Sequence, residues 1–199
     1  IEWFNGKVNM NLAQSKYAMD FLQKEGLDNP IMLNDFIPDT FFKSVNLEFK
    51  ENIILYNPKK GIEFTNKIIS QNPTLNFIPL INLKPEEVVS LLIKSKLYID
   101  FGEHPGRDRF PREASILGNV VVTGKDGSAN NNLDINIPTE YKFQKLDENI
   151  LSISNLIKDI LASHESHIKN QKSYHETISD GKNIFQNQVK YLISKMKNL

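Results

Sequence analysis

The stretch that decides the fold runs from Tyr98 to Ser115 and reads Tyr-Ile-Asp-Phe-Gly-Glu-His-Pro-Gly-Arg-Asp-Arg-Phe-Pro-Arg-Glu-Ala-Ser. It begins inside an apolar strand, predicted over residues 97–101, and passes through a polar loop at residues 102–108. Residues 109–117 read as the next helix, since proline is tolerated in a first turn and Gly118 follows as a stop. In a parallel sheet such a loop lies at the carboxyl end of its strand, where open α/β sheets bind their ligands.

Three arginines, Arg107, Arg109 and Arg112, crowd this loop and the start of the helix. Guanidinium groups and the free N–H groups of a helix N-terminus both suit phosphate. A salt-bridge network is the alternative, but surface ion pairs contribute only about 0–1 kcal/mol. We therefore predict that two of the arginines face phosphate, while the third pairs with Asp108 or Glu103.

Further apolar runs alternate with segments of helical spacing along the rest of the chain. Near-continuous apolar runs such as residues 52–56 suit strands that are buried on both faces, and apolar residues three or four apart suit helices. The alternation predicts an α/β fold: a Rossmann-like parallel sheet with right-handed crossovers and helices on both faces. The other strands are predicted at residues 76–80, 119–123 and 133–137, short extended pieces at 9–14 and 31–33, and helices at 16–25, 62–70 and 85–95.

The sequence divides into three predicted parts. Residues 1–50 are expected to form a hinge-like N-terminal segment packed on the domain, and residues 51–146 the Rossmann-like, nucleotide-sugar-binding core. From Asp147 onward, apolar residues at helical spacing predict a helical C-terminal extension over residues 147–199. Gly181 is expected to separate one long helix from a final one in this extension.

Composition narrows the functional classes. The 199 residues carry as many acidic as basic side chains, 24 of each, so charge gives no support for binding to nucleic acid or to a membrane surface. The absence of cysteine excludes disulfides and thiolate metal sites, and it fits a cytoplasmic protein. No apolar run reaches the length of a transmembrane helix, and no signal-peptide pattern opens the sequence.

Between residues 52 and 143 the order of elements and several short motifs resemble the C-terminal, nucleotide-sugar-binding half of GT-B type glycosyltransferases. In that family a strand ends in a turn with a Lys-Gly pair, here Lys60 and Gly61. A later strand ends in a glycine-containing loop, and the next helix carries Glu-Ala before a glycine and an apolar strand. The matching residues here are Gly106, Glu113, Ala114 and Gly118, followed by the glycine-rich loop at 124–128.

The resemblance implies that Glu113 binds the ribose hydroxyls and that Lys60 contacts the diphosphate. The family usually has an acidic residue eight positions before the helix glutamate. Pro105 stands there in this chain, and Glu103, two residues earlier, is the nearest substitute. Without the resemblance, Glu113 also fits a helix-surface or capping residue, and Lys60 fits an exposed turn.

The predicted site is thus built from three loops and from the helix that follows one of them. No catalytic residue is assigned. Neither a metal nor a cofactor is predicted, because no Asp-x-Asp motif appears in the loops. The predicted nucleotide-sugar-binding residues are Lys60, Gly61, Glu103, His104, Gly106, Arg107, Arg109, Arg112, Glu113, Gly127 and Ser128.

Histidines and one strand aspartate leave alternatives open. His104 is either a proton carrier or a loop histidine that forms local hydrogen bonds. Asp100 lies in an apolar strand, where a carboxylate needs partners, so it is expected to orient His104 or the loop backbone, or to face an edge. His164 and His167 have helical metal spacing, but the sequence offers no third ligand, and solvated surface is the expectation for both.

Three functions fit these observations. The first is the donor-binding half of a glycosyltransferase, which moves a sugar from a nucleoside diphosphate sugar to an acceptor without a metal, with cationic side chains stabilising the leaving diphosphate. Its partners would be the sugar nucleotide and an acceptor domain or acceptor glycan, since the acceptor half is expected to precede this chain. The second is a non-catalytic module that binds a sugar nucleotide or phosphate. The third is a phosphorylase or epimerase of the same architecture, which fold alone does not separate from a transferase.

Overall fold

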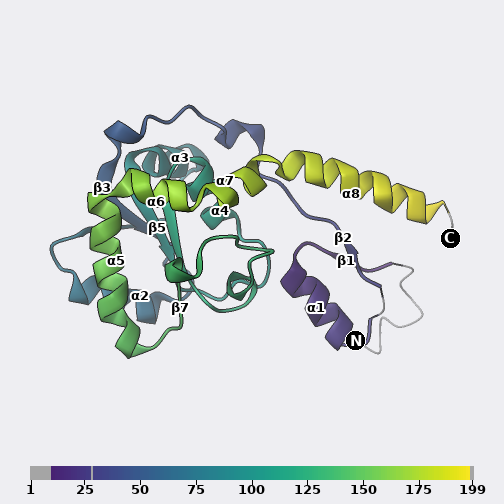
Figure 1. Ribbon diagram of the computed structural model, residues 1–199, viewed down its shortest axis with the longest axis horizontal. Helices are drawn as coiled ribbons and strands as arrows, with labels where there is room; N and C mark the ends of the chain where they lie inside the picture. The colour runs from purple at the N-terminus through teal and green to yellow at the C-terminus, as the bar shows by residue number, and fades with distance from the viewer. Residues whose placement is uncertain (1–9, 28, 198–199) are drawn as a thin grey trace.

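A computed structural model describes residues 10–27 and 29–197. Its main sheet has five parallel strands in the order β4-β3-β5-β6-β7 (Figure 1), which confirms the predicted Rossmann-like fold. The strands are β3 (Glu51–Tyr56), β4 (Asn76–Pro79), β5 (Ser95–Asp100), β6 (Val120–Gly124) and β7 (Lys142–Phe143).

The central strands are apolar because both faces of the sheet are covered. Ile54 of β3 lies opposite Leu97 of β5, and Leu97 lies opposite Val120 of β6. All three side chains are fully buried. Continuous rather than alternating apolar runs are typical of such doubly covered strands, which is why the sequence located them.

Helices cover both faces of the sheet. Right-handed crossovers place α2 (Ile62–Gln71) on one face, because β4 lies on one side of β3. They place α3 (Pro85–Lys94) and α4 (Arg109–Ile116) on the other face, because β5 and β6 follow on the opposite side. After β7 the chain forms α5 (Ile150–Ala162), which packs against α2. Short 3-10 helices lie at Asp39–Phe41, Leu47–Phe49, Ser128–Asn130, Thr139–Tyr141 and Asp147–Asn149.

The strand predicted at residues 133–137 is wrong. Asn131 Oδ1 accepts hydrogen bonds from the backbone N–H groups of Leu133 and Asp134, which makes a tight polar turn there. Ile135 and Ile137 still reach the core, where they are 2% and 1% exposed. The apolar pattern therefore predicted correctly that these residues are buried, but it did not predict their backbone conformation. The fifth strand of the sheet forms later in the chain, at β7.

The single long helix predicted before Gly181 is also wrong, since three helices occupy that region. They are α5, α6 (His164–Asn170) and α7 (Lys172–Ser179), and α8 (Gly181–Met196) begins at the predicted glycine. Between α6 and α7, the Gln171 amide donates to Val121 O (2.8 Å) and accepts from Val121 N (2.9 Å). Because β7 pairs with β6 only at Thr123 and Gly124, this amide takes the place of a strand partner, a role that helical periodicity does not reveal.

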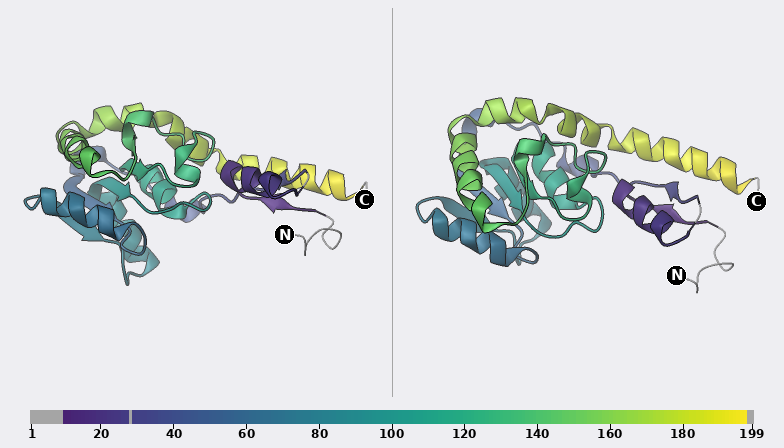
Figure 2. Two further views of the ribbon diagram at one scale, coloured as in Figure 1. Left: turned by 90° about the horizontal axis from the view of Figure 1, so that it is seen from below. Right: turned by 60° about the horizontal axis from the view of Figure 1, so that its bottom comes forward.

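The N-terminal residues form a small unit beside the core. Strands β1 (Leu12–Ala13) and β2 (Ile31–Met32) pair in parallel, and α1 (Lys16–Lys24) connects them. Figure 2 shows α8 extending beyond the core alongside this unit. Asn34 and Gln188 of α8 exchange two hydrogen bonds, of 2.8 and 2.6 Å, which tie α8 to the connection between β2 and the core.

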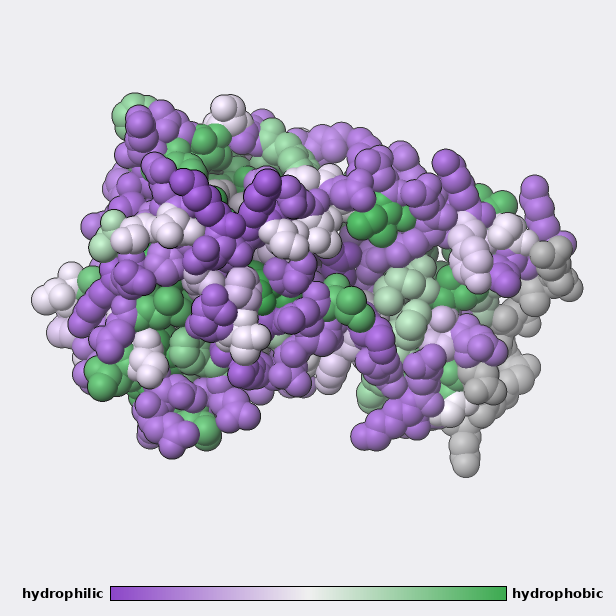
Figure 3. Space-filling model, viewed as in Figure 1, coloured by the Kyte–Doolittle hydropathy of each residue, from purple (hydrophilic) through white to green (hydrophobic). Residues whose placement is uncertain are grey.

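Asp134 of the core docks the first turn of α1. Its carboxylate accepts from Lys16 N (2.7 Å) and Tyr17 N (2.9 Å), while Ser15 Oγ accepts from Ala18 N (2.9 Å). These bonds satisfy amides that a helix leaves open at its start. The N-terminal unit is therefore held both by the core loop and by α8. A groove of about 880 Å³ remains between the unit and α8, and hydrophobic side chains are visible in this region in Figure 3.

Within the described ranges, no helix combines the length and the apolar character needed to cross a membrane.

The buried side chain of Lys50 caps the C-terminal end of α3. The residue is 6% exposed, and its ammonium donates to Leu92 O (2.9 Å) and Ser95 O (2.7 Å). Burial lowers the pKa of Lys50 from its ordinary value of 10.5 to about 7.

We expect the parent chain to gain stability with rising pH relative to a Lys50→Met variant, by about 2 kcal/mol between pH 7 and pH 9. The folded-state pKa lies below the unfolded one. The unfolded chain therefore binds more protons over this range, and raising the pH favours folding. Urea denaturation of both proteins at the two pH values measures the effect. A difference in stability that does not change with pH would mean that Lys50 stays charged.

Candidate functional site

The candidate site lies at the carboxyl edge of the sheet, where the loops after β3, β5 and β6 meet. A pocket of about 450 Å³ opens there beside the start of α4. One wall is apolar and the other carries charge. The pocket is lined by Phe41, Asn57, Lys60, Leu83, Pro85, Val88, Asp100, Asp108, Arg109, Phe110 and Glu113.

The loop after β5 is fastened to the loop after β6. Gly127 has a φ of +61°, and a Cβ at this position would lie 2.0 Å from His104 O. This close approach lets Ser128 N donate to His104 O (2.8 Å), while Ser128 Oγ donates to Gly106 O (2.5 Å). Ser128 is fully buried. Gly127 and Ser128 thus shape the loop, and neither lines the pocket.

Gly61 brings the turn after β3 against the same loop. It precedes α2 with a φ of +65°, and a Cβ there would lie 2.3 Å from Phe101 O. The side chain of Lys60 passes so close to Gly102 that a Cβ at Gly102 would overlap it. This path delivers the Lys60 ammonium to the middle of the loop, where it contacts Asp108 and donates to Glu103 O (3.1 Å).

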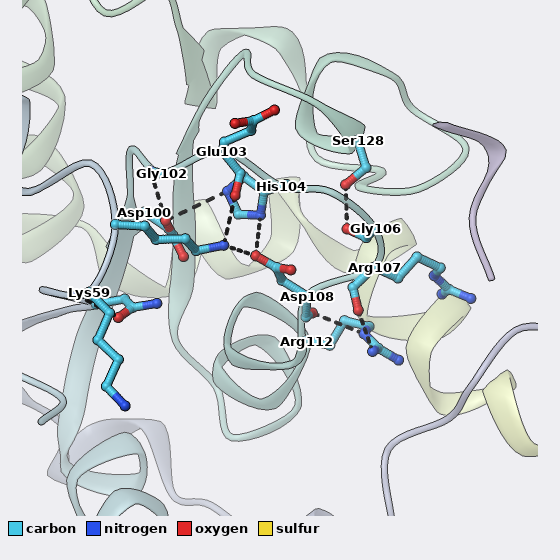
Figure 4. A network of polar contacts seen from close by, with 12 residues as sticks. Lys59, Asp100, Gly102, Glu103, His104, Gly106, Arg107, Asp108, Arg112 and Ser128 are labelled. Atoms are coloured by element: carbon cyan, nitrogen blue, oxygen red, sulfur yellow. Dashed lines mark hydrogen bonds and ion pairs between the residues drawn. The ribbon is translucent and has the colours of Figure 1, made fainter. Parts of the chain in front are cut away.

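A charged cluster formed by Lys60, Asp100, His104 and Asp108 occupies the base of the pocket (Figure 4). His104 Nδ1 lies 2.9 Å from Asp108 Oδ2, and His104 Nε2 lies 3.6 Å from Asp100 Oδ1. The imidazole is fully buried, and neither ring nitrogen makes a well-formed hydrogen bond with the described residues. Burial lowers the pKa of His104, opposed by the Asp100 charge, so the neutral ring is favoured.

Asp100 has the partners that a carboxylate in an apolar strand needs. Its oxygens accept from Gly102 N (3.0 Å) and from the Tyr98 hydroxyl (2.8 Å). The prediction that Asp100 orients the loop backbone is thereby confirmed. Burial, followed by the charge of Asp100, raises the pKa of Tyr98, so this hydroxyl remains a donor.

Glu113 and Arg109 lie together on the pocket side of α4. Arg109 Nη2 is 2.7 Å from Glu113 Oε1, and Arg109 lies over the Phe41 ring at 5.8 Å from its centroid. Glu113 is 4% exposed, and burial raises the pKa of its carboxyl, with Arg109 acting in the opposite direction. Both residues keep their predicted place beside the candidate ligand site.

Arg112 and Arg107 lie outside the pocket. Arg112 is 2% exposed and donates to Asp35 Oδ2 (2.9 Å), Arg107 O (2.6 Å) and Asp108 O (3.1 Å). Arg107 is 8% exposed, and it does not line the pocket. Of the three predicted phosphate ligands, only Arg109 borders the pocket. Arg112 instead ties the loop to the connection that carries Asp35, as the salt-bridge alternative proposed.

The Glu103 carboxylate lies outside the pocket. The side chain is exposed and points away from the charged cluster in Figure 4, whereas its backbone oxygen accepts from Lys60. Lys59 also points away from the cluster. Gly106 belongs to the fastened loop and lies against the side chain of Gln14.

The C-terminal histidine pair is buried, and the expectation of solvated surface is wrong. His164 is 5% exposed and His167 is 8% exposed. His167 Nδ1 lies 2.7 Å from the Tyr141 hydroxyl, and its Nε2 lies 3.1 Å from Asp159 Oδ2. Both ring nitrogens of His167 are thus engaged in packing α6 onto the core.

Three pocket-lining residues, Phe41, Leu83 and Phe110, were not predicted from the sequence to belong to the site. Phe41 belongs to the hydrophobic core, and Phe110 of α4 packs against it. The contribution of Phe41 to the pocket wall depends on the path of the connection between β2 and β3, for which no periodic signal exists.

Comparisons with known proteins show where this fold occurs. No family model and no curated protein matches the chain. Among solved structures, HepE of Anabaena in complex with UDP-glucose is similar with a TM-score of 0.72 and 13% identity, over 98% of this chain and 66% of HepE. Sucrose-phosphate synthase from Thermosynechococcus elongatus is similar with a TM-score of 0.71 and 16% identity, over 94% of this chain and 58% of that one.

A glycosyltransferase from Rickettsia africae is similar with a TM-score of 0.67 and 14% identity, over 100% of this chain and 67% of that one. This chain therefore has the fold of GT-B glycosyltransferases and spans about two thirds or less of the length of these proteins. The resemblance proposed from the sequence is confirmed at the level of the fold.

Proposed function

We propose that this chain is the donor-binding part of a glycosyltransferase that moves a sugar from a nucleoside diphosphate sugar to an acceptor. The observation that carries the proposal is the pocket at the carboxyl edge of the sheet, which brings together Arg109, Glu113 and Lys60 beside an apolar wall. A carboxylate suits the ribose hydroxyls, cationic groups suit the diphosphate, and the apolar wall suits the base. HepE, which shares the fold, is described with UDP-glucose.

In this proposal the protein acts by positioning and electrostatics. Negative charge builds on the diphosphate as the bond to the sugar breaks, and fixed cations and helix N–H groups stabilise that charge. Arg109 lies in the first turn of α4, and the side chain of the preceding Asp108 makes no capping bond to that turn. The start of α4 is therefore the place where we expect the diphosphate.

We further propose that the N-terminal unit belongs to the acceptor-binding side of the enzyme. Strands β1 and β2 form a sheet of their own, separate from the five-stranded sheet. Helix α8 leaves the core to lie beside this unit, and the rings of Phe36 and Phe185 pack at 5.2 Å. Together, residues 10–27, residues 29–33 and α8 then make one lobe, and residues 51–180 make the donor lobe.

Glu113→Gln is expected to weaken the binding of UDP and of uridine alike, by about tenfold or more, the scale of a lost charged hydrogen bond. The ribose is common to both ligands, so the losses should match. The fold should persist, because burial already raises the pKa of this carboxyl and thus favours a neutral group there.

Titration calorimetry measures both affinities, and Glu165→Gln on the exposed face of α6 serves as the matched control. Unchanged affinity in Glu113→Gln, or a parent chain that binds neither ligand, would contradict the proposed function.

A further inference from the structure

The His104 ring of the charged cluster lies between two carboxylates. Its Nδ1 is 2.9 Å from Asp108 Oδ2, its Nε2 is 3.6 Å from Asp100 Oδ1, and the side chain is fully buried. A neutral imidazole has one N–H group and can donate to only one of the two carboxylates, whereas the imidazolium has an N–H group on each nitrogen. The position of the ring therefore suits its protonated form.

The Lys60 ammonium opposes that protonation. It contacts Asp108 Oδ2, the same oxygen that faces His104 Nδ1. Burial is the main influence that lowers the pKa of His104, the Asp100 charge opposes it, and the Lys60 charge lowers this pKa further. Lys60 and a protonated His104 thus compete for one carboxylate, and the ring stays neutral while Lys60 occupies it.

A ligand in the pocket can reach Lys60 and Asp108 but not His104. Lys60 and Asp108 both line the pocket, with side chains that are 26% and 22% exposed, whereas His104 does not line it. Ion pairs with access to water contribute little to stability, so an anionic ligand can draw the ammonium away from Asp108. Asp108 would then face the imidazole without a cation.

We propose that an entering diphosphate draws Lys60 away from Asp108, and that the His104 ring then takes up a proton from solvent and donates to both carboxylates. This inference rests on the proposed function, which places a diphosphate beside Lys60. Asp108 holds the ammonium in the empty pocket, and His104 compensates Asp108 in the filled one. Because the filled state binds more protons, its affinity should rise as the pH falls, by at most about tenfold per pH unit.

Other charged groups around the ring do not take the place of Lys60. Asp126, in the loop after β6, has a charge that raises the pKa of His104, and this carboxylate is paired with Lys145. The side chains of Glu103 and Lys59 both point away from the cluster in Figure 4. The position of the Lys60 ammonium is therefore the variable that a ligand in the pocket can change.

Calorimetric titration with UDP-glucose, in buffers of different ionisation enthalpy, measures the protons taken up on binding. UDP-glucose is the probe because it has no terminal phosphate, a group that titrates near a pKa of about 6 and would take up protons itself. We expect proton uptake by the parent chain at neutral pH, and binding without uptake by His104→Gln. Lys59→Met removes the exposed neighbour of Lys60 and is the matched control, in which the uptake should persist.

A second measurement needs neither a ligand nor the His104→Gln variant. Among the four histidines, NMR titration should show one ring whose pKa rises by about one unit or more in Lys60→Met and not in Lys59→Met. Binding of UDP-glucose without proton uptake, uptake that persists in a folded His104→Gln, or no such rise in Lys60→Met would overturn the inference and leave the proposed function standing. A parent chain that binds no UDP-glucose would contradict the proposed function, and this inference with it.

Discussion

Gly127→Ala is expected to lower the free energy of unfolding by about 4 kcal/mol, from backbone strain and steric overlap together. Gly127 has a φ of +61° and a ψ of −136°, a conformation that side chains rarely adopt. The new Cβ would also lie 2.0 Å from His104 O and 2.8 Å from His104 C, both backbone atoms. Backbone cannot rotate away as a side chain would, so the two fastened loops must separate.

Gly26→Ala separates these two causes. Gly26 has a φ of +79°, but no atom lies within 4 Å of the position of its Cβ. Gly26→Ala should therefore lower the free energy of unfolding only by the conformational cost, about 1–2 kcal/mol. Urea denaturation of both variants gives the comparison. Losses of similar size would mean that the contact between Gly127 and His104 is relaxed in solution.

The consequence of Gly127→Ala for the site should be larger than its consequence for the core. His104 belongs both to the fastened loop, through its carbonyl, and to the charged cluster, through its ring. A loop that shifts to admit a methyl group moves the imidazole relative to Asp100 and Asp108. The glycine of the loop after β6 thus sets the geometry of residues that lie well before it in the chain.

The sequence predicted the parts of the fold that local pattern controls. Strands β3, β5 and β6 were located because burial on both faces makes their runs continuously apolar. The segment at 131–137 has no such run: Asn131 redirects the backbone into a turn while Ile135 and Ile137 still reach the core. Burial and strand conformation are separate properties, and a short apolar pattern reports only the first.

Only part of the site was predicted, because some of its residues depend on segments without a periodic pattern. Helical spacing placed Arg109 and Arg112 one turn apart, but the connection before β3 decides which of them is covered, and that connection has no periodicity. The sequence did not predict that Lys60 contacts the cluster of Asp100, His104 and Asp108, whose members come from a strand end, a loop and a helix cap. Their i, i+4 spacing is that of a helix, and no helix runs through them.

Arg112→Gln and Arg109→Gln are expected to separate stability from binding. Arg112 is buried and donates three hydrogen bonds, to Asp35, Arg107 O and Asp108 O. Its removal should cost about 3 kcal/mol of unfolding free energy, the lower end for breaking a buried ion pair, because the Asp35 side chain is 46% exposed and regains water.

Arg109 should show the reverse. Its side chain is 57% exposed, so Arg109→Gln should change stability by less than about 1 kcal/mol. If Arg109 faces the diphosphate, the variant should bind UDP about 5- to 150-fold more weakly while its affinity for uridine stays the same. Calorimetry with the two ligands, beside urea denaturation, decides the matter. Equal losses for UDP and uridine would assign Arg109 to holding Glu113 against the ribose, and no loss for either would leave it as a surface ion pair. Arg112→Gln is expected to weaken binding only to the extent that it displaces the loop that Arg112 holds.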